Sequence, residues 1–266
     1  MNVMITGAAG GLGRVFANEC GRRGYNMVLT DVNESGLNCI QKGIERQFGV
    51  QVITKVCDLT NAESVDQMLS VIDRKHMKFD ILLNIAGVDF EGDFLGRERE
   101  KVVNIVSLND AATLRITHAV LQRRRTGRAF TIIFVSSLAS LFPMPLKATY
   151  AASKRFLLDF ALSLRQELKN QNVNVLALCP GGMVTTKEAM QGIIAQGVLG
   201  DMTTNPLEVI ARKTLDRAFA EKAIYIPGAL NRILSLLGKW VPRKWIATAI
   251  YWRWNEAQKK WLMQTG

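Results

Sequence analysis

The 266-residue chain is poor in the side chains that bind transition metals. It has only two histidines, His76 and His118, and four cysteines, none of them in a Cys-x-x-Cys spacing. These counts argue against a zinc site and against a disulfide framework, and they favour reduced thiols in a cytoplasmic protein. We therefore predict that the protein has no metal site.

Long apolar runs are also missing. No stretch of about 18 uninterrupted apolar residues occurs, so a membrane-spanning helix is not expected. No basic and apolar leader precedes the first strand-like run at residues 2–6, and we expect no cleaved signal peptide. A hydrophobic content of 48% and a charged content of 21% are ordinary for a soluble globular domain.

Acidic residues are scarce relative to basic ones. The chain has 23 Asp and Glu against 34 Lys and Arg, which gives a formal net charge of +11. Such an excess favours an acidic substrate, a membrane surface or nucleic acid, and it also serves solubility. No recognised nucleic-acid-binding module is present, and the arginine-rich run at 122–128 is interpreted as a solvated loop. We expect no nucleic-acid partner.

Short β-branched runs alternate with longer helical stretches along the chain. Several of the runs are apolar on successive residues, which is typical of strands buried on both faces. The pattern predicts an α/β fold with a doubly wound, seven-stranded parallel sheet and helices on both faces. Strands are expected at 2–6, 26–30, 51–56, 80–83, 129–135, 173–178 and 223–226, and helices at 11–24, 34–48, 62–74, 98–121, 150–170 and 206–221.

Three glycines, Gly7, Gly11 and Gly13, stand between the first predicted strand and the first predicted helix. Glycine at such positions allows a tight turn, a close approach of backbone amides to a pyrophosphate, and close packing of helix on strand. The start of the helix then offers free N–H groups to the phosphate. The strand before and the helix after favour a dinucleotide-binding loop over a purely structural turn.

Asp31 ends the second predicted strand. A carboxylate at this place accepts hydrogen bonds from the ribose hydroxyls of the adenosine and repels a 2′-phosphate. No arginine or lysine lies in the surrounding run 29–33. The sequence therefore favours NAD over NADP, although an aspartate that only caps a turn is the competing interpretation.

Tyr150 and Lys154 are four residues apart and share one face of a predicted helix, and Ser137 follows the fifth predicted strand. The ordinary pKa of a tyrosine phenol, about 10, is too high for a base at neutral pH. A nearby lysine ammonium favours the phenolate and lowers this pKa, and a serine hydroxyl can hold a substrate oxygen. Ligands bind at the carboxyl ends of the strands in such sheets. These residues thus predict proton transfer to an alcohol or a ketone.

Six motifs, in this order, resemble those of the short-chain dehydrogenase/reductase family in its single-domain form, over about residues 1–228. They are Thr6-Gly7-x-x-x-Gly11-x-Gly13, Asp58-Leu59-Thr60, Asn84-Ile85-Ala86-Gly87, Asn104, Ser137 with Tyr150-Ala151-Ala152-Ser153-Lys154, and Pro180-Gly181 with Val184-Thr185. The remainder, residues 229–266, is expected to be a helical tail, either part of the same domain or appended to it.

The resemblance implies a catalytic tetrad. Tyr150 would be the general acid/base, Lys154 would lower the pKa of Tyr150 and bind the nicotinamide ribose, Ser137 would orient the carbonyl, and Asn104 would hold a water of the proton relay. The family's dimers and tetramers imply a homo-oligomer. The implied cofactor-binding residues are Gly7, Ala9, Gly11, Leu12, Gly13, Asp31, Asp58, Leu59, Asn84, Ala86, Gly87, Tyr150, Lys154, Pro180, Gly181, Val184 and Thr185.

Three positions depart from the family pattern. Ile85 replaces the second asparagine of Asn-Asn-Ala-Gly, a change expected to affect strand packing more than chemistry. Ser140 replaces a glycine in the loop over the substrate. Arg155 replaces a small residue after the catalytic lysine, where it either adds a charge near the site or faces solvent.

The substrate is expected to be lipophilic. The loops after the fifth and sixth strands, 138–149 and 182–204, are rich in leucine, isoleucine and methionine, which suit a bulky apolar ligand or, alternatively, packing on the fold or on another subunit. A hydroxysteroid or bile acid is the favoured interpretation. The alternatives are another lipophilic or acyl-type carbonyl substrate, or a non-catalytic dinucleotide-binding scaffold associated with a membrane.

All five tryptophans lie after residue 239, and from Ala229 to Gly266 seven residues are basic and one, Glu256, is acidic. The segment predicts one or two basic amphipathic helices, a combination that suits a membrane interface. Three interpretations stay open: peripheral membrane contact, packing on a partner subunit or over the substrate pocket, and a loosely packed end.

Overall fold

The computed structural model describes residues 1–183, 204–238 and 240–253. Its centre is a seven-stranded sheet in which every pair of neighbouring strands is parallel, in the order β3-β2-β1-β4-β5-β6-β7. This confirms the predicted doubly wound sheet. The strands are β1 Asn2–Thr6, β2 Asn26–Asp31, β3 Val52–Val56, β4 Ile81–Asn84, β5 Phe130–Val135, β6 Val173–Leu178 and β7 Ile224–Tyr225.

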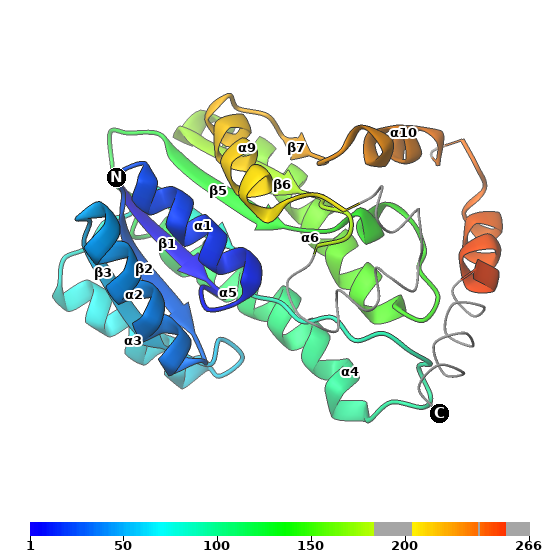
Figure 1. The fold of residues 1–266 in the computed structure, drawn as a ribbon, viewed down its shortest axis with the longest axis horizontal. Helices are drawn as coiled ribbons and strands as arrows, with labels where there is room; N and C mark the ends of the chain where they lie inside the picture. The colour runs from blue at the N-terminus through cyan, green and yellow to red at the C-terminus, as the bar shows by residue number, and fades with distance from the viewer. Residues whose placement is uncertain (184–203, 239, 254–266) are drawn as a thin grey trace.

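Helices cover both faces of the sheet (Figure 1). One apolar cluster joins α1, α2 and α9 to one face, and a second joins α3, α5 and α6 to the other. The strands are apolar on successive residues because their side chains enter both clusters in turn. The bounds are α1 Gly11–Arg22, α2 Glu34–Phe48, α3 Ala62–Arg74, α4 Arg99–Val106, α5 Thr113–Leu121, α6 Ala148–Glu167, α9 Leu207–Phe219 and α10 Ala229–Leu237.

The predicted helix at 98–121 is interrupted. Between α4 and α5 the chain forms a π-helical segment, η1 Ser107–Ala112, in which Asn109 and Asp110 are buried. A π-helical turn is wider than an α-helical one and is found at functional sites. It shifts the side chains after it to a different face, and sequence periodicity does not reveal this shift.

The order of the strands reverses between β1 and β4: β2 and β3 extend the sheet on one side of β1, and β4 to β7 extend it on the other. A crevice is expected between the loops that follow β1 and β4. The Thr6 hydroxyl oxygen accepts hydrogen bonds from the backbone N–H groups of Ile85 and Ala86, at 3.1 and 3.2 Å. Gly7 has a φ of +65°, and a Cβ there would lie 2.7 Å from the Ala86 Cα. A Cβ on Gly13 would lie 2.1 Å from the Gly7 carbonyl oxygen. The glycines therefore allow the close contact that shapes the crevice.

The region after β7 contains two helical pieces. α10 is followed, after a short turn, by a helix at residues 243–253, and both lie at the end of the molecule opposite β3 (Figure 1). None of the helices within the described ranges is long and apolar enough to cross a bilayer. The same ranges hold no cluster of His, Cys, Asp and Glu suited to a metal ion.

We expect Gly13→Ala to lower the free energy of unfolding, because its Cβ would overlap the Gly7 carbonyl oxygen. Overpacking of this kind costs about 1–3 kcal/mol. Gly43→Ala is the matched control, since Gly43 lies inside α2 with open space around the Cβ position. That change should raise the unfolding free energy by roughly 0.5–1 kcal/mol. Urea unfolding compares the three proteins, and equal stability of the two variants would contradict the packing described.

Candidate active site

The loop after β1 fits a dinucleotide pyrophosphate. α1 begins at Gly11 with no side chain capping its first turn, so its terminal N–H groups are left for an anion. The Gly7 and Gly13 positions leave no room for a Cβ, which keeps the backbone close to the crevice. Gly87, on the opposite wall after β4, is constrained similarly, because a Cβ there would lie 2.9 Å from the Asn109 Oδ1.

Asp31 lies at the end of β2, beside this loop. Its Oδ2 accepts a hydrogen bond from the backbone N–H of Ala9 at 2.9 Å, and its Oδ1 accepts one from the N–H of Asn33 at 3.0 Å. These bonds hold the carboxylate in place at the carboxyl edge of the sheet. Asp58 follows the neighbouring strand β3 and is exposed, and its Oδ1 accepts bonds from the N–H and hydroxyl of Thr60.

Tyr150 lies in the first turn of α6 and meets Ser137, which follows β5. The Ser137 side chain acts to lower the pKa of Tyr150. The Ser137 Oγ also accepts the N–H of Ala139 at 3.1 Å, and the Ser140 hydroxyl donates to the Ser137 carbonyl at 2.6 Å. Ser140, the residue that replaces the family's glycine, thus holds the backbone of Ser137 in place.

Lys154 is buried one turn further along α6. Its Nζ donates to the Val135 carbonyl oxygen at 3.0 Å and lies 5.7 Å from the centre of the Tyr150 ring. Burial lowers the pKa of Lys154 to about 8, while the carboxylates of Asp110 and Asp89 act in the opposite direction.

The expected lowering of the Tyr150 pKa by Lys154 is not present in this structure. Burial raises the pKa of Tyr150, the Asp89 carboxylate raises it further, and the Ser137 side chain lowers it only in part. Desolvation dominates because the phenol lies in a partly enclosed site, and the Lys154 ammonium is bound by the Val135 carbonyl. The protonated phenol is therefore the favoured form here.

A second lysine, Lys147, was not predicted. Its Nζ lies 5.8 Å from the centre of the Tyr150 ring and forms ion pairs with Asp89 at 2.6 Å and Glu91 at 3.3 Å. Burial acts to lower the pKa of Lys147, but the two carboxylates outweigh it and the pKa is raised. The phenol thus lies among two ammonium groups and the carboxylate of Asp89.

Asn104 is exposed on α4, and among the described residues no side-chain hydrogen bond joins it to Tyr150 or Lys154. Asn109, five residues later in η1, is fully buried. Its Oδ1 accepts the N–H of Val88 at 2.8 Å, and its Nδ2 donates to the Val88 carbonyl and the Ser153 hydroxyl at 3.1 and 3.0 Å. The two asparagines therefore lie on different sides of this helical stretch, one facing solvent and the other the interior.

Asp110, next to Asn109, is also buried, and its Oδ1 has no hydrogen-bond partner among the described residues. Burial raises the pKa of Asp110 to about 6, partly offset by the Lys154 ammonium. Arg155, in contrast, faces solvent and pairs with Asp159 at 2.7 Å, which decides between the two roles that the sequence left open.

A hollow beside Tyr150 is formed by two segments. One is the start of α6 with the residues before it, which the sequence identified, and the other is the segment after β4, which it did not. The lining residues are Phe90, Gly92, Phe94, Arg97, Val102, Ile105, Leu146, Lys147, Ala148, Thr149 and Tyr150. Arg97 lies 5.8 Å from the Phe90 ring centre, and its Nε is buried without a partner among the described residues.

The other predicted site segments lie at the ends of β4, β5 and β6. The Leu138 N–H donates to the Pro180 carbonyl at 2.7 Å, which ties together the loops after β5 and β6. The Asn84 amide donates to the Thr117 hydroxyl at 3.0 Å, and Ile85 packs against the apolar cluster of α1, α2 and α9. Val184, Thr185 and most of the predicted loop at 182–204 lie outside the described residues.

A family model described as short chain dehydrogenase matches residues 1–192. The chain belongs to this family. The family expected from the sequence is thereby confirmed.

Among curated relatives, a very-long-chain 3-oxoacyl-CoA reductase of Laccaria bicolor is 31% identical over 179 residues, which are 65% of this chain and 52% of that protein. The chain therefore spans about half the length of the curated relatives that it matches first.

Two solved structures illustrate the shared fold. A 7β-hydroxysteroid dehydrogenase has a TM-score of 0.82 at 19% identity, over 94% of this chain and 96% of its own. A 3-oxoacyl-[acyl-carrier protein] reductase from Brucella melitensis, with NAD bound, has a TM-score of 0.73 at 21% identity, over 85% and 89%. At these identities the similarity establishes the fold alone.

We expect Asp110→Asn to change how stability depends on pH. The pKa of Asp110 is raised from 3.8 to about 6, so its protonated form contributes stability that is complete below pH 3.8 and is lost as the pH rises through about 6. The variant should gain up to about 3 kcal/mol relative to wild type between these limits. Urea unfolding at several pH values measures the difference. Asp66→Asn, an exposed carboxylate on α3, is the control, and a pH-independent difference for Asp110→Asn would contradict the prediction.

Proposed function

We propose that the protein is an NAD(H)-dependent oxidoreductase that interconverts a secondary alcohol and a ketone on a lipophilic substrate. The observation that carries the proposal is the grouping of three side chains beside the hollow. The buried Lys154 Nζ lies 5.7 Å from the centre of the Tyr150 ring, and the Ser137 side chain acts on the pKa of Tyr150. Ser137 follows β5, and Tyr150 and Lys154 lie on α6, the next long helix; β5 is the neighbour of β4, whose loop borders the crevice where dinucleotides bind in such sheets.

The chain's own residues supply positioning and proton transfer. Ser137 would donate a hydrogen bond to the substrate oxygen, and the protonated Tyr150 phenol would give it a proton during ketone reduction. Lys154 would hold a ribose hydroxyl and return a proton to Tyr150. A bound nicotinamide supplies or accepts the hydride. In the oxidative direction Tyr150 must act as a base, which requires its raised pKa to fall on ligand binding.

Asn109, rather than Asn104, is proposed as the fourth member of the tetrad. Its amide bridges Val88, after β4, and Ser153, beside Lys154 on α6. A Cβ on Gly87 would come within 3.2 Å of the Lys154 Nζ and 2.9 Å of the Asn109 Oδ1, so the three residues adjoin one another. We propose that Asn109 positions the loop after β4 and the water of the proton relay.

Asp31 supports a preference for NAD over NADP. Its carboxylate is fixed by the amides of Ala9 and Asn33 at the end of β2 and would repel a 2′-phosphate. The cofactor contacts proposed for the glycine loop, Asp58, Leu59, Asn84, Ala86, Gly87, Pro180 and Gly181 follow from their positions at the strand ends.

The hollow supports an acidic amphiphile as substrate. Phe90, Phe94, Ile105 and Leu146 supply apolar walls, and Arg97 supplies a guanidinium whose Nε has no partner within the described residues. A hydroxysteroid with a carboxylate side chain, such as a bile acid, would meet both requirements. A 3-oxoacyl thioester with an acidic carrier would meet them as well, and the names of the curated relatives favour this second candidate. A homo-oligomer remains a prediction.

We expect Tyr150→Phe to abolish turnover, by at least a hundredfold, while NADH still binds, because the phenol proton is lost and the loop after β1 is unchanged. Oxidation and reduction of nicotinamide are followed by absorbance over a panel of secondary alcohols, bile acids and 3-oxoacyl thioesters, with both cofactors. Turnover of Tyr150→Phe at the wild-type rate would refute the mechanism, and tighter binding of NADPH than NADH would refute the role of Asp31.

The two asparagines provide a matched pair for the same assay. Asn109→Ala should lower kcat by roughly tenfold or more, because the polar bridge between Val88 and Ser153 is lost. Asn104→Ala, on the exposed side of α4, should retain wild-type kcat. A loss of kcat in Asn104→Ala, with wild-type kcat in Asn109→Ala, would assign the role to Asn104 instead.

Arg97→Gln should lower kcat/KM for acidic substrates by roughly ten- to a hundredfold, because a charged hydrogen bond is lost. It should change kcat/KM for the uncharged amide or ester of the same substrate by less than about threefold. Arg99→Gln, on the exposed first turn of α4, is the control. An equal loss for acid and ester would show that Arg97 acts only on the shape of the hollow.

A further inference from the structure

The helix α10 turns polar side chains toward the domain and apolar side chains toward solvent. It buries the polar residues Asn231 and Ser235 against the domain and exposes Ile233, Leu236 and Leu237 to more than half of their surface. The Asn231 Nδ2 donates to the Pro227 carbonyl, and the Ser235 hydroxyl donates to the Arg232 carbonyl. An ordinary surface helix turns its apolar stripe toward the core. The exposed apolar stripe of α10 therefore indicates a surface that binds a partner.

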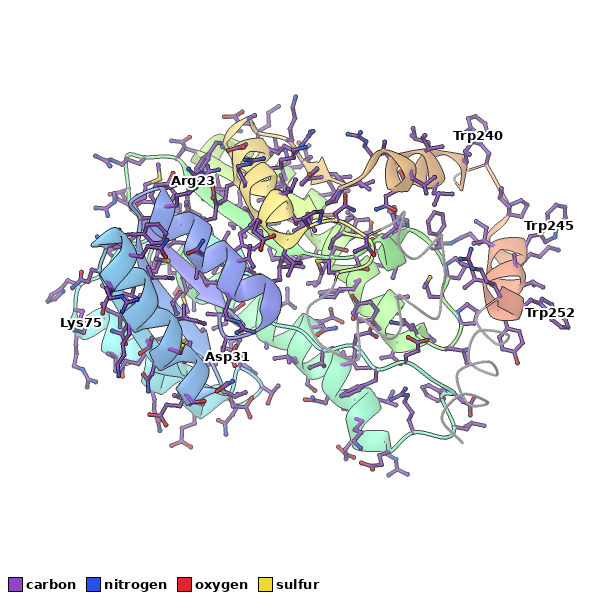
Figure 2. All side chains as sticks on the ribbon, in the orientation of Figure 1. Arg23, Asp31, Lys75, Trp240, Trp245 and Trp252 are labelled. Carbon is purple, nitrogen blue, oxygen red and sulfur yellow. The ribbon has the colours of Figure 1, made fainter. Side chains whose placement is uncertain are left out.

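The three described tryptophans extend this apolar surface. Trp240 is 89% exposed, and Trp245 and Trp252 are each more than half exposed. Figure 2 shows all three at the same end of the molecule, directed away from the sheet, with Lys75 at the opposite end. Contiguous apolar patches of this kind mark interaction sites. We call α10 and residues 240–253 together the tail surface.

The charge on the tail surface is of one sign. It carries the exposed cations Arg232, Arg243, Lys244 and Arg253, and no acidic residue occurs in the sequence between Glu221 and Glu256. The described residues of the tail surface form no ion pair with acidic side chains. Exposed indole rings next to unneutralised cations match the chemistry of an anionic bilayer surface, where rings lie at headgroup level and cations meet lipid phosphates.

We propose that the tail surface docks on the surface of an anionic lipid bilayer, without spanning it. A second copy of the chain is disfavoured as the occupant, because a two-fold interface would bring two cationic faces together with no acidic residue to pair them. This inference goes beyond the proposed function and does not depend on catalysis.

The tail surface adjoins the substrate side of the domain. A Cβ on Gly238, at the end of α10, would lie 2.1 Å from the Phe142 Cε1, so this helix end is seated on the loop that follows Ser137. α10 also contacts the short helix η2 Leu138–Leu141. Docking would therefore bring the bilayer beside the loop over the active site, where a lipophilic substrate is concentrated.

Because every tryptophan of the chain lies after residue 239, intrinsic tryptophan fluorescence reports on the tail alone. The full-length protein is titrated with vesicles of phosphatidylcholine with and without phosphatidylserine. We expect a blue shift and co-sedimentation with the anionic vesicles only, both weakened at high salt. Absence of binding to anionic vesicles would overturn the proposal, and salt-insensitive binding to the neutral vesicles would overturn its electrostatic part.

A matched pair of charge reversals tests the location. Arg243→Glu with Lys244→Glu should weaken vesicle binding by roughly thirtyfold or more, since each cation near such a membrane contributes about fivefold. Arg74→Glu with Lys75→Glu makes the same change in net charge on the exposed end of α3 and should leave binding within about threefold. Equal losses in the two variants would show a diffuse charge effect and refute the tail surface.

Apolar contact is tested by Ile233→Ser with Leu237→Ser, which changes two side chains that are each more than half exposed and belong to neither apolar cluster. Vesicle binding should fall by at least tenfold while circular dichroism and the melting temperature stay at wild-type values. Multi-angle light scattering of the wild type and this variant tests the alternative occupant, a second copy of the chain. A wild-type dimer that these substitutions dissociate, together with no vesicle binding, would assign the surface to a second copy.

Discussion

The buried ammonium of Lys154 is the constraint around which the site is arranged. A lysine removed from water needs hydrogen-bond acceptors and nearby negative charge. The Val135 carbonyl accepts from its Nζ, and the carboxylates of Asp110 and Asp89 oppose the loss of its proton. The Ser136 hydroxyl also binds the Lys154 carbonyl at 2.7 Å, which fixes α6 to the end of β5. Placing Lys154 in this way places Tyr150 one turn earlier on the same helix.

The π-helical segment η1 contributes to the same environment. It contains the buried Asn109 and Asp110, and the Asp110 carboxylate favours the charged form of Lys154. Gly87 has no side chain because a Cβ would enter the space between Asn109 and Lys154. The local irregularity is thus tied to the site's electrostatics, as is common for π-helical turns.

Much of the fold could be predicted from residue patterns alone, because strands buried on both faces and helices with one apolar face leave strong periodic signals. The bounds of β1, β6, α2 and α3 agree with the expected ranges. The burial of Asn109, which we propose for the tetrad in place of Asn104, could not be predicted, because it depends on a helical widening that periodicity does not reveal. The environment of Tyr150 could not be predicted for a similar reason: one-turn spacing places an ammonium nearby but does not show that a carbonyl binds it or that burial raises the Tyr150 pKa. Arg97 lies in an irregular segment without a motif, so only the three-dimensional contacts bring it to the hollow.

The distribution of charge connects the active site with the tail surface. The segment from Ala229 to Gly266 has seven basic residues and one acidic residue, so it carries six of the eleven net positive charges in about a seventh of the chain. A charge that served solubility would be spread over the surface and would accompany polar side chains. Here it accompanies outward-facing leucines and tryptophans, beside the loop that follows Ser137. A lipophilic substrate with an acidic group would be held in the hollow by Arg97 and would itself partition to a bilayer surface. The substrate chemistry that the hollow favours and the membrane chemistry that the tail surface favours are therefore mutually consistent, although each rests on separate residues.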